Sequence, residues 1–288
     1  MVTLSRWWVL LFISLLYLTV AIGNARAKEE NHNKFHSVIK ATTNENTERN
    51  LKKIPQRRDI QAIDLLKSSL LKLEQQKAMK LDVFVSDERV FKGNIPINFV
   101  YEYQVAVEGD SKIRLTFPKA SGKGILIYAH GIVTYFDAKR NLYTQGNYEG
   151  TLGGLMDELS YQFQLRLPGV ELLKRNTSNV IDNYTQSAFY IGREKIIEGI
   201  AHHLAFFNKE IDWQIWIDER TLLPLYVILT HKHLKGQPQT HLHYKNWYLG
   251  NTLNEDLFEF IPPDGAVDYG QFRSRIIDSL KEKKNNAE

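Results

Sequence analysis

Apolar residues recur at every second position through most of this 288-residue chain, as in β-strands that bury one face. The pattern runs from residue 81 to about residue 143 and resumes at residue 184. Turn-forming pairs such as Gly93-Asn94 and His130-Gly131 separate the segments. Short alternating segments of this kind predict an antiparallel meander of about ten strands rather than alternating strands and helices.

Within each predicted strand, the residues at alternate positions would lie on the same face of the sheet. Leu81, Val83 and Val85 alternate with polar positions, and so do Trp213, Ile215 and Ile217. Phe258 and Phe260 predict a final strand that ends at Pro262-Pro263. A sheet of this length must curl or close to bury its apolar face, because a flat open sheet would leave it in water.

Two segments have the helical period instead. Asp59 is a plausible N-cap for an amphipathic helix that we expect to reach about Lys80, with Ile60, Ile63, Leu66, Leu70 and Leu73 along one stripe. A second helix is predicted over residues 151–167, and a short one over 170–173. Two apolar helix faces are enough to cover one face of a curved sheet. The predicted fold class is therefore α+β, mainly β.

The N-terminus reads as an export signal. Arg6 precedes an apolar run over residues 7–22, and the small-x-small triplet Ala25-Arg26-Ala27 follows. This order predicts a signal peptide over residues 1–27 that is cleaved after Ala27. The alternative is an uncleaved anchor, but the sixteen-residue run is short against the ~20 residues that a membrane-spanning helix needs. We expect an exported protein with no stable membrane span after cleavage.

The rest of the chain divides by composition. Residues 28–58 are rich in Asn, Lys and Glu and nearly free of large apolar groups, which predicts a flexible leader. Residues 59–267 carry the periodic segments and predict one folded domain. Residues 268–288 are predicted to be a charged C-terminal tail.

Composition and motifs exclude several classes of function. The chain has no cysteine, which excludes a disulfide scaffold, a thiolate zinc site and a cysteine nucleophile. Its 37 basic and 33 acidic residues are too evenly balanced for a protein dedicated to nucleic acid. No G-x-S-x-G, phosphate-binding glycine loop or H-E-x-x-H motif occurs. We therefore expect a protein that is not an enzyme and needs no cofactor.

Three stretches carry a resemblance to a known family. They are Ala201–Asp218 (AHHLAFFNKEIDWQIWID), Phe258–Ala266 (FEFIPPDGA) and Ile127–Asp137 (IYAHGIVTYFD). With these motifs, residues 59–267 resemble a family of predicted periplasmic proteins of unknown function, which is in turn similar to the outer-membrane lipoprotein carriers LolA and LolB. The resemblance implies a location in the periplasm and a curved antiparallel half-barrel, covered by helices, that encloses an apolar cavity. Relatives of this fold hold acyl chains or lipid-modified proteins in that cavity.

A candidate ligand site follows from the resemblance together with the apolar stripes. It would hold a lipid, an acyl chain or another apolar molecule, and its lining would come from both helices and one strand segment. The candidate residues are Leu66, Leu70, Phe99, Tyr101, Tyr103, Leu152, Leu155, Met156 and Leu159. The alternative is a filled interior, with an envelope protein bound on the outer surface.

Four histidines suggest a third possibility. His231, His233, His241 and His243 flank the connection over residues 234–240. If the two strands pair symmetrically, all four imidazoles project from one face, with opposite pairs about 5 Å apart at Cβ. Such a group would bind a transition metal or respond to pH near 6–7. A one-residue shift of register removes this arrangement. The alternative is that the histidines simply form the polar end of two strands at the rim of the sheet.

Overall fold

The computed structural model describes residues 57–119, 122–163, 167–173, 177–178 and 185–270. The chain divides into two units, residues 1–54 and 55–288, and the described residues all belong to the second. The predicted signal peptide, the predicted leader as far as residue 56 and the tail from residue 271 lie outside the described residues. Within the described ranges, no helix has the length and apolar character needed to cross a membrane.

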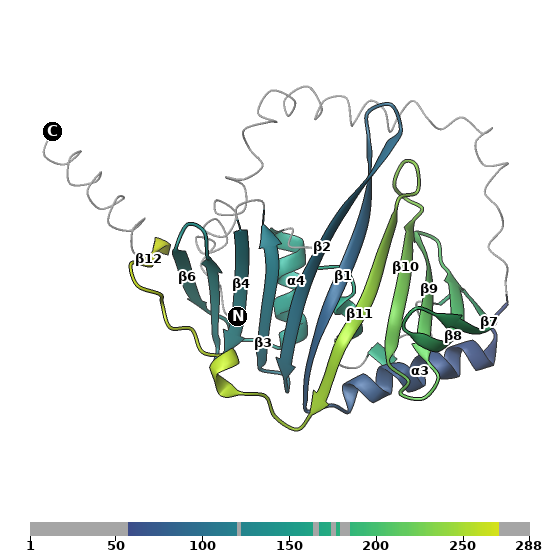
Figure 1. Cartoon of the computed structure of the whole chain (residues 1–288), viewed down its shortest axis with the longest axis horizontal. Helices are drawn as coiled ribbons and strands as arrows, with labels where there is room; N and C mark the ends of the chain where they lie inside the picture. The colour runs from purple at the N-terminus through teal and green to yellow at the C-terminus, as the bar shows by residue number, and fades with distance from the viewer. Residues whose placement is uncertain (1–56, 120–121, 164–166, 174–176, 179–184, 271–288) are drawn as a thin grey trace, which may run out of the picture. The chain divides into compact units, whose positions relative to one another are not determined.

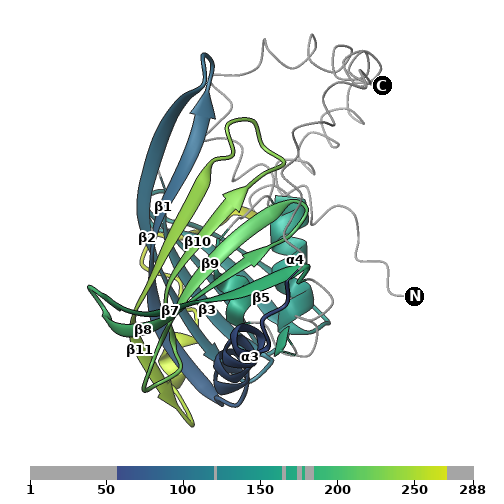
Figure 2. The ribbon, with the colours of Figure 1, turned by 90° about the vertical axis from the view of Figure 1, so that its right-hand side faces the viewer.

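One twelve-stranded sheet dominates the described part of the chain (Figure 1). The strands, in chain order, are β1 (Ala78–Phe91), β2 (Ile95–Glu108), β3 (Lys112–Lys119), β4 (Gly122–Ala129), β5 (Ile132–Asp137), β6 (Leu142–Asn147), β7 (Ser187–Ile196), β8 (Gly199–Phe207), β9 (Ile211–Asp218), β10 (Pro224–His231), β11 (Gln239–Gly250) and β12 (Val267–Asp268). Their order across the sheet is β12-β6-β5-β4-β3-β2-β1-β11-β10-β9-β8-β7. The sheet is open and curved (Figure 2), which confirms the predicted mainly-β antiparallel fold.

The sheet consists of two meanders that meet at β1. β1 pairs with β2 on one side and with β11 on the other, both antiparallel. The β1–β2 hairpin turns at Gly93 and Asn94, which both have positive φ, as a tight hairpin turn requires. β2 pairs with β3 only from Gln104 onward, so the end of this hairpin extends past its neighbour (Figure 1).

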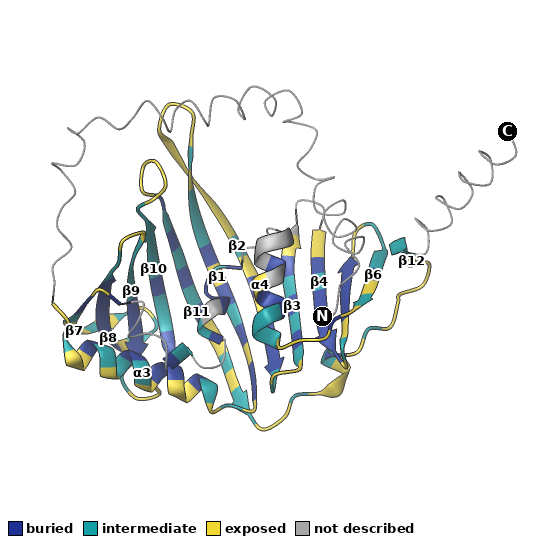
Figure 3. Ribbon diagram, turned by 180° about the vertical axis from the view of Figure 1, so that it is seen from behind, coloured by how far each residue is buried: buried dark blue, intermediate teal, exposed yellow. Residues whose placement is uncertain are grey.

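Two helices and a short 3-10 turn lie on one face of the sheet, which we call the inner face. They are α3 (Ile60–Glu74), α4 (Leu152–Phe163) and η2 (Val170–Leu173) (Figure 3). The strands bury alternate residues beneath them, and Leu81, Val83 and Val85 are each at most 1% exposed. The predicted period of two therefore identifies the inner face correctly.

The first helix is shorter than predicted. Asp59 caps it as expected, because its Oδ1 accepts a hydrogen bond from the Gln61 backbone N–H at 3.0 Å. The expected end near Lys80 is wrong, since residues from Ala78 onward pair with both β2 and β11. The hydrogen bonds of two neighbouring strands outweigh the helix propensity of this stretch.

The predicted final strand at Phe258 and Phe260 is also wrong. Asn254 caps a 3-10 turn, η3 (Glu255–Leu257), which crosses the opposite or outer face of the sheet. Phe258 is buried there against Ala106, Ile127 and Ala129. The chain then reaches β12, which pairs in parallel with β6. Two aromatic residues at alternate positions thus anchor a covering segment rather than a strand.

Candidate ligand site on the inner face

A cavity of about 400 Å³ lies on the inner face beneath the first turns of α4. Strands β2 and β3, helix α4 and the η2 turn each contribute to it. Its apolar walls are Val107, Ile113, Leu152, Met156, Val170 and Leu173. Asp110, Thr151 and Asp157 form polar parts of its lining. A cavity of this size with mostly apolar walls and a few polar groups has the character of a small-molecule site.

Local sequence explains why α4 begins where it does. Thr151 caps the helix, because its Oγ1 accepts a hydrogen bond from Gly154 N–H at 3.1 Å and its carbonyl accepts one from Leu155 N–H at 3.0 Å. Leu152 N–H donates to the Asp110 carbonyl at 3.3 Å, which ties the helix start to the β2–β3 turn. A Cβ added at Gly153 would meet nothing nearer than Thr151 Oγ1 at 3.9 Å, so this turn leaves open space.

The segment after α4 is fixed to the sheet by two tyrosines. Tyr103 O–H donates to the Pro168 carbonyl at 2.5 Å, and Tyr244 O–H donates to the Gly169 carbonyl at 3.2 Å. Gly169 has φ of +92°, and a Cβ there would lie 2.3 Å from the Tyr244 hydroxyl oxygen. Only glycine fits this position, which places η2 at the cavity.

The predicted lining residues fall into three groups. Leu152 and Met156 line the cavity. Five others are core residues: Leu66, Leu70, Tyr103, Leu155 and Leu159, each at most 3% exposed. Val107, Ile113, Val170 and Leu173 complete the cavity and were not predicted as lining. A signal for two of them was present in the alternating pattern, because Val107 and Ile113 are direct cross-strand partners on the inner face.

Phe99 and Tyr101 form the third group and lie on the β1–β2 hairpin, away from the cavity. Phe99 is 38% exposed and the Arg89 guanidinium lies 4.6 Å from its ring centroid. Burial, reinforced by the nearby Asp87 carboxylate, raises the pKa of Tyr101 to about 12. Phe91, Ile95 and Ile97 on the same hairpin are between 44% and 56% exposed.

The predicted arrangement of four histidines is not formed. His243 lies opposite Tyr226 and His241 lies opposite Ile228, so the register differs by five residues from symmetric pairing. An odd offset moves side chains to the other face, and His231 instead contacts Thr240 Oγ1 at 3.1 Å through its Nε2. His233 lies in the turn beyond β10. Within the described residues, no three His, Asp or Glu side chains are grouped to hold a metal ion.

His241 and His243 instead belong to a row of rings on the outer face. The His203 and Trp216 rings stack at 3.9 Å between centroids, and Tyr226 lies 4.2 Å from His243. Glu194 accepts hydrogen bonds from Trp216 Nε1 at 2.8 Å and His203 Nδ1 at 2.9 Å. These bonds, that of Trp216 first, hold the pKa of Glu194 below its usual range. Burial and then the neighbouring His243 lower the pKa of His241.

Comparison with known families gives one match across most of the domain. Residues 62–268 match the family described as "Predicted periplasmic protein (DUF2092)". This confirms the family resemblance drawn from the sequence motifs. A search of curated protein sequences gives no match.

Several solved structures are similar to this chain. An uncharacterized conserved protein from Thermus thermophilus is 11% identical at a TM-score of 0.39, over 72% of this chain and 94% of that one. A LolA superfamily protein from Nitrosomonas europaea is 13% identical at a TM-score of 0.35, over 69% of this chain and 97% of that one. MucB from Pseudomonas aeruginosa, solved in complex with MucA, is 16% identical at 0.41, over 70% of this chain and 61% of that one.

Proposed function

The chain belongs to the DUF2092 family of predicted periplasmic proteins, and on that premise we propose that it is an exported binding protein that carries an apolar ligand. The ligand is a lipid, an acyl chain or a molecule of similar character. It occupies the inner-face cavity between α4, η2 and the sheet. The function is binding and transport rather than catalysis.

The cavity is the observation that carries this proposal. Its volume of about 400 Å³ falls in the range of roughly 300–1,000 Å³ typical of small-molecule sites. Each methylene buried against its apolar walls contributes about 0.8 kcal/mol, so a short acyl segment suffices for useful affinity. Asp110 and Asp157 carry carboxylates at the lining, which favours a ligand with a neutral or amine head over one with a carboxylate.

The first test is to identify what the protein holds. The full chain, exported and processed by its own host, is purified from the periplasm without detergent. Native mass spectrometry followed by solvent extraction should give a discrete bound mass that partitions as lipid. Protein at its calculated mass, which also fails to bind the neutral probe N-phenylnaphthylamine, would contradict the proposal.

A matched pair of variants locates the ligand. Leu152 and Ile60 are each the first residue of a helix, where a carboxylate is favourable to the helix dipole. Leu152 lines the cavity, whereas Ile60 is 73% exposed. Leu152→Asp should therefore lose N-phenylnaphthylamine fluorescence, and Ile60→Asp should keep it. Equal binding by two folded variants would place the ligand elsewhere.

A second candidate function is the binding of an envelope protein, and the β1–β2 hairpin favours it. Its exposed side chains Phe91, Ile95 and Ile97 form an apolar surface of the kind that marks interaction sites. Ile97→Asp should then remove a partner in affinity capture from the native envelope while leaving lipid retention unchanged. Loss of lipid without loss of a partner would support the carrier function alone.

A further inference from the structure

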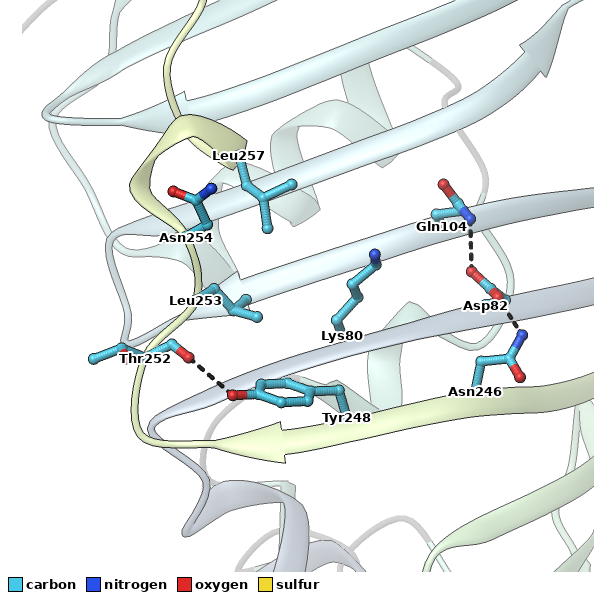
Figure 4. Close-up of a pocket in the computed structure, with 9 residues that line it drawn as sticks. All are labelled: Lys80, Asp82, Gln104, Asn246, Tyr248, Thr252, Leu253, Asn254 and Leu257. Carbon is cyan, nitrogen blue, oxygen red and sulfur yellow. Dashed lines mark hydrogen bonds between the residues drawn. The ribbon is translucent and has the colours of Figure 1, made fainter.

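A second pocket, of about 600 Å³, lies on the outer face of the sheet (Figure 4). It forms where the segment leading into η3 passes over the ends of β11, β1 and β2. It shares no lining residue with the inner-face cavity and lies on the opposite face of the sheet, where β2 contributes to both. Its chemistry is also different, because its side chains are mostly polar.

A β-bulge builds one side of this pocket. Lys80 pairs with Tyr248 and Asp82 pairs with Lys245, so Asn246 and Trp247 together lie opposite a single residue of β1. Asn246 has φ of 55°, a left-handed conformation that Asn adopts more readily than most other residues. The extra residue lets Asn246 and Tyr248 both line the outer pocket, and Trp247 turns away to donate its Nε1–H to the Pro224 carbonyl at 3.1 Å.

Two amides are held in fixed orientation beside the bulge. Gln104 Nε2 donates to Asp82 Oδ1 at 2.8 Å, and Asn246 Nδ2 donates to Asp82 Oδ2 at 2.6 Å (Figure 4). Each NH₂ group bonds to the carboxylate through one of its two hydrogens, so each amide offers a ligand its oxygen as an acceptor and its second N–H as a donor. The two amide oxygens and the remaining lone pairs of Asp82 form an array of acceptors suited to hydroxyl groups.

A cation and a flat apolar wall complete the pocket. The Lys80 side chain stands between the acceptor array and the opposite wall (Figure 4). That wall contains Leu253, Leu257 and Tyr248, whose hydroxyl donates to the Thr252 carbonyl at 3.3 Å. This bond fixes the tyrosine ring, which remains 48% exposed.

We propose that the outer pocket binds a sugar that carries a carboxylate. Its hydroxyl groups would donate to Asp82, Gln104 and Asn246, its carboxylate would pair with Lys80, and its C–H face would rest on the ring of Tyr248. A neutral sugar leaves the Lys80 ammonium without a partner, and a simple anion leaves the acceptor array unused. An acyl chain would cover polar groups without replacing their hydrogen bonds to water.

Calorimetric titration of the mature exported protein with three probes at constant ionic strength tests this inference. Sodium glucuronate carries both the hydroxyl groups and the negative charge. Glucose carries only the hydroxyl groups, and acetate carries only the charge. We expect glucuronate to bind at least tenfold more tightly than either of the others. Acetate binding as tightly as glucuronate would reduce the pocket to an unspecific anion site and overturn the proposal, as would no binding of glucuronate.

Three variants assign the binding to these residues. Lys80→Met should lower the affinity for glucuronate to that for glucose, whereas Lys245→Met removes the same charge from the adjacent strand outside the pocket and should change little. Asn246→Gly keeps the backbone conformation and removes one acceptor, so it should weaken glucuronate and glucose alike. Equal effects of the two lysine variants would contradict the inference. Retention of N-phenylnaphthylamine by Lys80→Met would show that the inner cavity is intact.

Discussion

The two helices cover the inner face of the sheet in different ways. In α3, Ala62, Leu66, Leu70 and Leu73 are at most 1% exposed. α4 buries Leu155 and Leu159 almost as fully, but its first turns border a cavity of about 400 Å³. Different strands of the same sheet therefore lie beneath a closed core at α3 and beside an open site at α4.

Attachment to the sheet explains much of this difference. The approach to α3 is hydrogen-bonded to β7, because Asp59 N–H donates to the Ala188 carbonyl at 3.0 Å and Ala188 N–H donates to the Arg57 carbonyl at 2.9 Å. Arg57 and Arg58, the last two residues of the predicted leader, are thus held beside β7. α4 has two adjacent glycines in its first turn, and missing side chains leave space. The close packing of α3 stabilises the fold, whereas α4 leaves a cavity with room for a small molecule.

The largest expected effect on stability comes from a substitution in the closed core beneath α3. Leu66→Ala should lower the free energy of unfolding by about 2–5 kcal/mol, because it leaves a cavity in a site that is 0% exposed. Leu152→Ala should cost less than about 1 kcal/mol, since its side chain already borders open space. Urea unfolding followed by circular dichroism measures both. Similar losses would mean that the two helices are packed alike.

Removing the helix caps compares the two attachments. Asp59→Ala should cost about 1 kcal/mol, because the cap to Gln61 N–H is lost. Asp64→Ala, on the exposed side of α3, should cost almost nothing and controls for charge. Thr151→Ala should cost a similar amount to Asp59→Ala, but it alone should weaken N-phenylnaphthylamine binding. A binding loss in Asp59→Ala would tie the cavity to α3 as well.

A smaller effect should come from making α4 more regular. Gly153→Ala should raise the free energy of unfolding by up to about 1 kcal/mol, because alanine has the higher helix propensity and the added Cβ meets no close neighbour. Thermal unfolding with and without N-phenylnaphthylamine separates stability from binding. Destabilisation by this substitution would show that the turn needs glycine for its backbone.

The smallest effect concerns the outer face of the strands that carry α3. The lowered pKa of Glu194 means that its stabilising contribution is present above the usual carboxyl pKa of about 4.3 and is lost as pH falls through the lower folded value. Wild type should therefore lose more stability than Glu194→Gln between about pH 5 and pH 3. The free energy of unfolding of both proteins is measured by urea titration at each pH. The same pH dependence in wild type and Glu194→Gln would show that this carboxylate does not contribute to stability.

Much of the fold follows from the sequence because alternation and capping are local properties. Leu81, Val83 and Val85 are buried as their period predicts, and Asp59 caps α3. The end of α3 could not be predicted in the same way, because pairing of residues 78–80 with two distant strands decides it. Phe258 and Phe260 have a strand-like spacing, yet Phe258 packs on the surface of a sheet whose position the local sequence does not define.

The site was predictable only in part, for two physical reasons. The stripe of α4 identifies its inner face, but it does not show that Leu155 touches the sheet while Leu152 borders a cavity. Register is the second reason. The connection between His231 and His241 is long enough to permit several pairings, and the observed odd offset separates the histidines.

The first and last described segments of the chain pair with strands at the two edges of the sheet, and this has a consequence for self-association. An open sheet presents unpaired backbone groups at its two edges, where strands of other molecules can add and form aggregates. Here Val267 and Asp268 lie along β6, and Arg58 bridges to Ala188 of β7. At each edge the chain's own incoming or outgoing segment pairs with one or two residues, so a protein trimmed at residue 59 or residue 266 should polymerise more readily at high concentration.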